Sequence, residues 1–281
     1  MVAGRGAPGS MRIPSAIPAA SASCKVSPSD SSRNTQPPSS SRPLREFYHS
    51  GAFAGIVSSA NLYRMPDGTE IVLVRHGESE ANVAEIWQGH MESPLSGLGR
   101  RQAASAGRAL RSFPVAAIYS SPLGRAVETA EIIARETGYA GEIVKLPGLI
   151  ERHGGILQGH HWPDYAAANP ELAERFLSAP DSERWALVGA EDTPSVLRRA
   201  RGAIEEILRR HDAGEVVVVT THGGLLKAFL SDTFGREIFE NGEPRVPNTS
   251  ITRILYNASG PKLLELASTG HLERVTTQPT D

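Results

Sequence analysis

Residues 70–79 read Glu-Ile-Val-Leu-Val-Arg-His-Gly-Glu-Ser, and this stretch decides the fold. The segment Glu70–Val74 is mostly apolar and has the length of a strand. Residues 215–220, Glu-Val-Val-Val-Val-Thr, repeat this pattern with four consecutive valines. Apolar runs of this kind are typical of strands that are covered on both faces. Because such strands occur in parallel sheets flanked by helices, the two segments predict an α/β protein.

Outward from these strands, helical and extended patterns alternate along the chain. Helices are expected at 98–111, 123–137, 164–177 and 224–233, and from Pro194 onward with Thr193 as the N-cap. Further strands are expected at 116–119, 142–146, 251–256 and 263–267. The order predicts a three-layer sandwich with a mostly parallel central sheet and helices on both faces.

The composition excludes several kinds of protein. The chain has 281 residues, a net charge of −2 and a single cysteine, Cys24. One cysteine cannot form an intrachain disulfide or a cysteine-based zinc site. No apolar run reaches the roughly 18–20 residues of a membrane helix. Near-neutral charge provides no general attraction to nucleic acid or acidic membrane, so we expect neither of them as a partner, and any preference for anions must come from a local cluster of residues. A monomer and a homodimer both stay open.

Residues 1–66 differ from the rest, because Ser, Pro, Ala and Gly dominate. We expect a disordered N-terminal extension at 1–66 and one domain at 67–281, since such a composition buries too little apolar surface. Three interpretations stay open for the extension: a transit peptide, a plain tail, or untranslated sequence ahead of a start at Met65. The last two are favoured. The expected location is therefore cytoplasmic, with organelle import as the alternative if residues 1–64 are a transit peptide.

Chemistry-bearing residues follow the strands. Arg75 and His76 end the first strand, and His222 follows the four valines in Thr-Thr-His-Gly-Gly. Arg125 begins a helix just after the strand at 116–119. Active groups of α/β sheets gather at the carboxyl ends of strands, so these side chains should converge. Guanidinium groups bind phosphate oxygens, and imidazole is a nucleophile near neutral pH. The sequence therefore predicts a phosphate site.

Six pieces in order resemble the histidine phosphatase superfamily, which contains phosphoglycerate mutases and acid phosphatases. They are Leu73-Val74-Arg75-His76-Gly77-Glu78-Ser79 with Asn82; Gln88-Gly89 and Ser93-Pro94-Leu95-Ser96 with Gly99 and Gln102; Ser121-Pro122-Leu123-Gly124-Arg125-Ala126 with Thr129-Ala130; Leu149-Ile150-Glu151-Arg152 with Gly155 and Gln158-Gly159; Thr221-His222-Gly223-Gly224; and Pro247-Asn248-Thr249-Ser250-Ile251. The resemblance spans about residues 69 to 271.

The resemblance implies the roles of the site residues. His76 would attack phosphorus and become a phosphohistidine. Arg75, Arg125 and His222 would hold the phosphate oxygens, and Glu151 would be the acid and base. The implied substrate-binding residues are Arg75, His76, Gly77, Glu78, Ser79, Asn82, Gln88, Gly89, Arg125, Glu151, His222 and Gly223. No metal and no cofactor are expected, because the arginines take the electrostatic role of a divalent ion.

We expect a phosphatase acting on a small phosphorylated metabolite. Mutases of the family place a tyrosine three residues after the acid, where this chain has Gly154. They also carry a long basic insertion for which the segment between Glu151 and Glu191 is too short. The alternative enzyme is a cofactor-dependent phosphoglycerate mutase, and a non-catalytic phospholigand-binding module is the alternative of another class. The loop at 160–162, His-His-Trp, is expected to select the substrate.

Overall fold

The computed structural model describes residues 67–242 and 244–276, so the predicted extension at 1–66 lies outside the described residues. These residues form a six-stranded sheet in the order β3-β2-β4-β1-β5-β6. Three neighbouring pairs are parallel and the two at the β5–β6 edge are antiparallel. The predicted mostly parallel sheet is confirmed. Its strands are β1 (Thr69–Arg75), β2 (Val115–Ser120), β3 (Ile143–Lys145), β4 (Val216–Thr221), β5 (Ile251–Asn257) and β6 (Gly260–Ser268).

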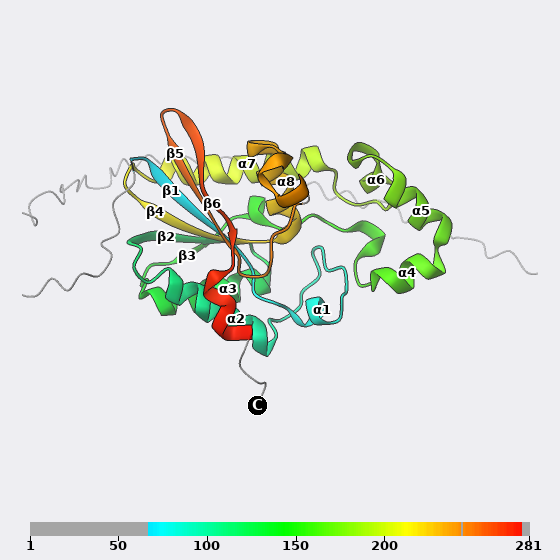
Figure 1. The fold of residues 1–281 in the computed structure, drawn as a ribbon, viewed down its shortest axis with the longest axis horizontal. Coiled ribbons are helices and arrows are strands. Elements are labelled where there is room, and N and C mark those ends of the chain that lie inside the picture. The colour runs from blue at the N-terminus through cyan, green and yellow to red at the C-terminus, as the bar shows by residue number, and fades with distance from the viewer. Residues whose placement is uncertain (1–66, 243, 277–281) are drawn as a thin grey trace, which may run out of the picture. The chain divides into compact units, whose positions relative to one another are not determined.

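Helices cover both faces of the sheet, as Figure 1 shows. On one face lie α2 (Gly97–Ala109) and α3 (Gly124–Thr137), and on the other lie α7 (Thr193–Arg210) and α8 (Gly223–Phe234). Alternate residues of β1 and β4 point to opposite faces and enter different cores. Ile71 and Val217 pack with α7 and α8, whereas Val72 and Val218 pack with α2 and α3. Burial on both faces explains the unbroken apolar runs.

The segment between Glu151 and Glu191 contains more and shorter helices than the sequence pattern predicts. The expected helix at 164–177 is two helices, α4 (Trp162–Ala168) and α5 (Pro170–Ser178), followed by α6 (Asp181–Leu187). The break falls at Asn169, because a residue before proline avoids the helical conformation. The apolar side chains of this segment pack together and against Trp87, and we call this group the cap cluster. Its members are Trp87, Leu157, Trp162, Tyr165, Phe176, Trp185, Leu187, Val188 and Ala190.

A smaller correction concerns the start of α7. Thr193 is the first helical residue, and Asp192 is the N-cap, whose side chain accepts a hydrogen bond from the Ser195 amide at 2.8 Å. The remaining short elements are α1 (Glu80–Val83), η1 (Pro147–Leu149), η2 (Gly155–Leu157), η3 (Arg236–Ile238), η4 (Glu240–Gly242), η5 (Gly270–Leu272) and α9 (Glu273–Thr276). Across the described ranges, every helix is too short or too polar to cross a membrane.

Candidate active site

The register between β1 and β4 brings the two predicted histidines together. Arg75 pairs with Thr221 at the ends of these parallel strands, so His76 and His222 leave the sheet side by side. Their ring centroids lie 5.1 Å apart. The side chains that follow separate apolar strands therefore meet at one edge of the sheet, as the sequence predicted.

His76 is held as a neutral ring with a defined tautomer. Its Nδ1 lies 2.7 Å from the carbonyl oxygen of Gly77, and because a carbonyl only accepts, Nδ1 carries the proton. The lone pair is therefore on Nε2. Burial lowers the pKa of His76 well below its usual range, and the positive charges of Arg75 and Arg125 lower it further. The ring is a free base at neutral pH.

His222 lies behind His76 and is fully buried. Its Nε2 is 2.7 Å from the Ser121 hydroxyl oxygen. Burial, followed by the neighbouring His76 and Arg125, lowers the pKa of His222 well below its usual range. Both imidazoles are thus neutral, and His222 contributes a hydrogen-bonding edge rather than a charge.

The two predicted arginines supply the positive charge of the site. Nη1 of Arg75 donates to the Val246 carbonyl at 2.7 Å, and the two Nη atoms of Arg125 donate to the carbonyls of Met91 and Gly89, each at 2.8 Å. Burial lowers the pKa of both guanidinium groups, and both are cations because arginine stays protonated in proteins.

Three buried nitrogens at this edge have no hydrogen-bond partner among the described residues: Nε of Arg75, Nε of Arg125 and Nδ1 of His222. Buried polar atoms are nearly always paired in folded proteins. The unpaired N–H groups of the two arginines lie beside a neutral imidazole, and this arrangement suits an anion.

Glu151 follows β3 and η1 in the chain, and its side chain lies at the N-terminus of α8. Its carboxylate accepts hydrogen bonds from the amides of Gly224, Leu225 and Arg152 at 2.8, 2.9 and 2.8 Å. A Cβ at position 224 would lie 2.6 Å from Oε1 of Glu151, so glycine is required for this close approach. The helix terminus therefore fixes the carboxylate beside the site.

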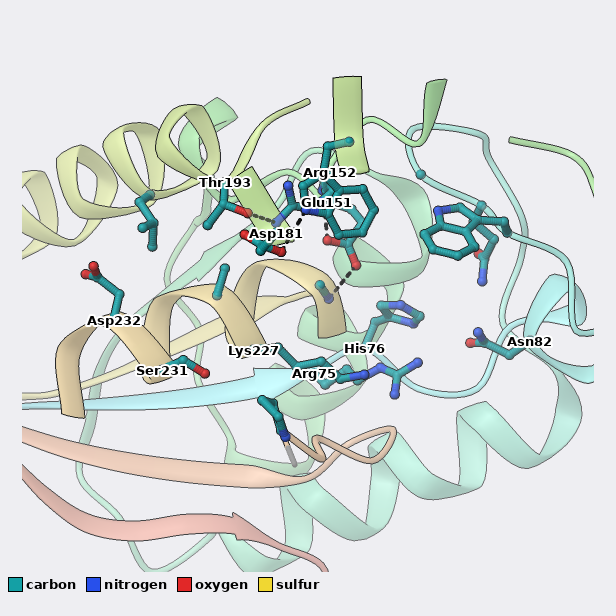
Figure 2. Close-up of a pocket in the computed structure, with 18 of the residues that line it drawn as sticks. Arg75, His76, Asn82, Glu151, Arg152, Asp181, Thr193, Lys227, Ser231 and Asp232 are labelled. Carbon is teal, nitrogen blue, oxygen red and sulfur yellow. Dashed lines mark hydrogen bonds between the residues drawn. The ribbon is translucent and has the colours of Figure 1, made fainter. Parts of the chain in front are cut away.

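These groups open into a cavity of about 610 Å³ (Figure 2). Seven predicted site residues line it: Arg75, His76, Asn82, Gln88, Gly89, Arg125 and Glu151. Five others, Gly77, Glu78, Ser79, His222 and Gly223, are not among the residues that line it. The Gly77 amide donates to Thr129 Oγ1, and the Glu78 carboxylate accepts from the Ser96 hydroxyl at 2.7 Å. Gly77 and Glu78 support the wall through these bonds.

The sequence reasoning left much of the cavity wall unassigned. The additional lining residues are Ile86, Trp87, Arg152, Asp181, Trp185, Thr193, Leu197, Gly224, Lys227, Ala228, Ser231, Asp232, Arg236 and Pro244. The loop at 160–162, which we expected to select the substrate, does not line the cavity. The one indication in the sequence was the spacing of residues 224, 228 and 231, which places them on the same face of a helix and so on one wall of a cavity.

Arg152 joins the cap cluster to the cavity. This guanidinium is 7% exposed and lies 4.0 Å from the ring centroid of Trp185. It donates to the Glu191 carbonyl at 2.6 Å and to Thr193 Oγ1 at 3.0 Å. The indole Nε1 of Trp185 donates to Asp181 at 2.9 Å. This network ties α6 and the start of α7 to the residue that follows Glu151.

Comparison with known proteins gives concordant results. Residues 71–269 match the histidine phosphatase superfamily, branch 1. The chain is 42% identical to a metal-independent phosphoserine phosphatase of Arabidopsis thaliana over 162 residues, which cover 57% of this chain and 66% of that protein, just under two thirds. It is 34% identical to phosphoglycerate mutase-like protein 4 of the same plant over 192 residues, covering 66% of this chain and 78% of that protein.

Among solved structures, Bacillus stearothermophilus YhfR superimposes with a TM-score of 0.62 at 31% identity. The match covers 73% of this chain and 100% of that one. The fold thus agrees with that of the solved relative, and the family match extends over well more than half of the chain. The chain therefore belongs to the histidine phosphatase superfamily, branch 1, and has the fold of that enzyme family.

Proposed function

We propose that the protein hydrolyses a phosphomonoester of a small metabolite through a phosphohistidine at His76. The observation that carries the proposal is the state of this ring: neutral, protonated on Nδ1, and next to Arg75 and Arg125 in the cavity wall. A lone pair on Nε2 beside two guanidinium groups combines a nucleophile with the charges that an incoming phosphate requires.

In the first step, Nε2 of His76 forms a bond to phosphorus while the bond from phosphorus to the ester oxygen breaks. Glu151 gives a proton to the departing oxygen. In the second step, water attacks phosphorus, the bond from nitrogen to phosphorus breaks, and Glu151 takes a proton from the water. The products are an alcohol and inorganic phosphate, and Glu151 returns to its starting state.

The positive groups reduce the barrier of both steps by balancing the charge on the three non-bridging oxygens. The unpaired Nε atoms of Arg75 and Arg125 are available as donors to these oxygens with small shifts of the side chains, and Nδ1 of His222 is a third donor when the Ser121 hydroxyl donates to Nε2. These donors need little reorganisation, because burial and the carbonyls of Gly89 and Met91 fix Arg125 beforehand.

Hydrolysis and mutase activity differ in what happens to the phosphohistidine. The match to a phosphoserine phosphatase supports hydrolysis, whereas the match to a phosphoglycerate mutase-like protein supports the alternative. The segment between Glu151 and Glu191 holds only η2 and the three short helices α4, α5 and α6, and the cavity that it bounds reaches about 610 Å³. A wide cavity admits water to the phosphohistidine, which favours hydrolysis.

The deciding experiment incubates the protein with p-nitrophenyl phosphate, phosphoserine and 3-phosphoglycerate, and quantifies both free phosphate and isomerised product. Release of phosphate at the rate of substrate loss is expected. Conversion of 3-phosphoglycerate to its 2-isomer in the presence of 2,3-bisphosphoglycerate, with little free phosphate, would establish the mutase instead. Turnover by His76→Ala at the wild-type rate would exclude both.

A further inference from the structure

One ion pair holds the backbone on both sides of Glu151 without touching the cavity. Arg199 of α7 and Glu191, which lies just before that helix, form it through two parallel hydrogen bonds of 2.8 Å, from Nε to Oε1 and from Nη2 to Oε2. Each side chain is 19% exposed, so salt and solvent screen this pair less than a surface ion pair. Neither residue is among those that line the cavity.

Arg199 also binds the chain that leads into Glu151. Its Nη1 donates to the Gly148 carbonyl at 3.1 Å and to the carbonyl of Ile150, the residue directly before Glu151. A Cβ at position 148 would lie 2.5 Å from the backbone carbonyl oxygen of Arg199, so this turn packs directly on α7. The approach of the chain to Glu151 is therefore fixed on that helix.

Glu191 binds the chain that follows Glu151. Its amide donates to the His153 carbonyl at 3.0 Å, and its own carbonyl accepts from Nη1 of Arg152 at 2.6 Å. Arg152 also donates to Thr193 Oγ1, a bond that Figure 2 draws beside Glu151. The two members of the ion pair thus hold the chain before and after Glu151.

Both members of the pair are charged at neutral pH. Burial raises the pKa of the Glu191 carboxyl, but the hydrogen bonds and the charge of Arg199 outweigh burial and hold that pKa below its usual value. Arginine stays protonated in proteins. Bidentate bonds between full charges are stronger and better defined in geometry than bonds between neutral groups, so the pair is suited to holding a backbone in place.

The position of this backbone matters for the proposed chemistry. The amides of Gly224 and Leu225 hold the end of the Glu151 side chain, but they do not fix the backbone from which it extends. A displacement of about 1 Å at a reacting group can lower a rate by about 10²-fold. Proton transfer from Glu151 therefore requires that the chain at residues 150–153 stays where it is.

We infer that Arg199 and Glu191 are positioning residues, which hold Glu151 at the distance from which it protonates the departing oxygen. The inference rests on the proposed hydrolysis at His76 and adds two residues outside the cavity to it. Because Glu191 ends the segment that carries the cap cluster, the same pair also connects that segment to the acid.

The test compares kcat/KM for hexyl phosphate, whose leaving group needs a proton, with kcat/KM for p-nitrophenyl phosphate, whose leaving group does not. Arg199→Met keeps much of the apolar stem and removes every bond of the guanidinium. It should lower the ratio of hexyl to p-nitrophenyl phosphate by about tenfold, since only the first reaction depends on the placement of the acid. A general loss of folded protein would lower both values alike and leave the ratio unchanged.

The matched control is Arg253→Met, which breaks another partly buried ion pair, that of Arg253 Nε with Glu70 Oε1 at 2.6 Å. Glu70 lies near the start of β1, roughly 16 Å along the strand from Arg75 at its end. Both variants should lose stability in urea unfolding, but the control should keep the wild-type ratio. If Arg199→Met does not fold, Glu191→Gln takes its place, because glutamine keeps the side-chain size; it should lower the ratio by about threefold.

A second comparison repeats Arg199→Met in the Glu151→Gln background. The ratio should not fall further there, because residues that act through one group are not additive. An equal fall in both backgrounds, or a ratio that Arg199→Met changes no more than Arg253→Met does, overturns the positioning role. Hexyl phosphate turnover by His76→Ala at the wild-type rate would instead overturn the hydrolysis itself. If turnover depends on His76 and Glu151 but not on Arg199, the hydrolysis stands and the positioning role is wrong.

Discussion

Two regions of the cavity are built in different ways. At the phosphate end, Arg75, His76 and His222 directly end or follow strands of one sheet, and the register of β1 with β4 fixes them. At the cap cluster, Trp87 from the loop after α1 meets Trp162 and Trp185 from α4 and α6, with ring centroids 6.4 and 6.2 Å apart. The first region depends on ladder hydrogen bonds and the second on side-chain packing.

The difference indicates that the phosphate end and the cap cluster have different roles. Burial and unpaired donors make the phosphate end specific for one chemical group, whatever the rest of the substrate is. Trp87 and Trp185 of the cap cluster and α8 form another part of the wall, which would meet the remainder of the substrate in the proposed function. Variants of the first region should therefore affect chemistry, and variants of the second should affect affinity and selectivity.

The largest effect is expected from His76→Ala, which removes the nucleophile. We expect kcat on p-nitrophenyl phosphate to fall by about 10⁴-fold or more. Acid-quench trapping with radiolabelled substrate should show a phosphoenzyme in the wild type and none in the variant. A residual rate within tenfold of the wild type would show that the reaction does not take place at this end of the cavity.

Arg125→Met should lower kcat by about 10²–10³-fold, because a preorganised charge is lost. It should also raise the pKa of His76, since the positive charge of Arg125 contributes to the lowered value. NMR titration of the His76 ring would measure this shift. Arg125→Lys keeps the charge and should leave the pKa closer to the wild-type value; equal pKa values in all three proteins would contradict this account.

Glu151→Gln should lower kcat by about 10²-fold on alkyl phosphates, and less on p-nitrophenyl phosphate, whose leaving group needs no proton. Gly224→Ala tests the same group from α8, because the added Cβ would lie 2.6 Å from Oε1 of Glu151 and would displace the carboxylate. It should show the same dependence on the leaving group. Equal losses on both substrates would assign Glu151 a structural role.

In the cap cluster, Trp185→Ala should raise KM about fivefold, or about 1 kcal/mol, with little change in kcat. Trp162→Ala is its control, since Trp162 belongs to the same cluster but does not line the cavity. Both variants should lose stability in urea unfolding, and only the first should change KM. If Trp185→Ala lowered kcat as much as Glu151→Gln does, the two regions would not differ in their effects on chemistry and affinity.

The smallest effect is on stability against pH. His76 and His222 have lowered pKa values in the folded state, so below about pH 6.5 the unfolded chain binds more protons. Stability should be constant above that pH and fall below it, by up to about 1.4 kcal/mol per pH unit for each histidine. Urea unfolding between pH 5.5 and 7.5 measures this slope, and His222→Asn should reduce it but not abolish it, because burial also lowers the pKa of His271. Stability that increases on acidification would contradict the buried neutral rings.

Residue by residue, the phosphate end was predictable because each group is next to a strong local pattern. His76 and His222 each follow a run of apolar β-branched residues, and the edge at which parallel strands end is set by topology. The wall was less predictable. Asn169 breaks the expected helix because Pro170 follows it, and Asp192 rather than Thr193 caps α7. Both differences depend on local backbone geometry rather than on apolar periodicity.

The sequence by itself determined the α/β fold, the parallel sheet and the candidate nucleophile, because apolar runs and the motifs at their ends are local properties of the chain. Only the tertiary structure decided that His222 lies buried behind His76, that Glu151 is fixed on the N-terminus of α8, and that Lys227 and Arg236 share a cavity with the reacting group. These arrangements join segments far apart along the chain, and their distances follow from how helices pack on the sheet.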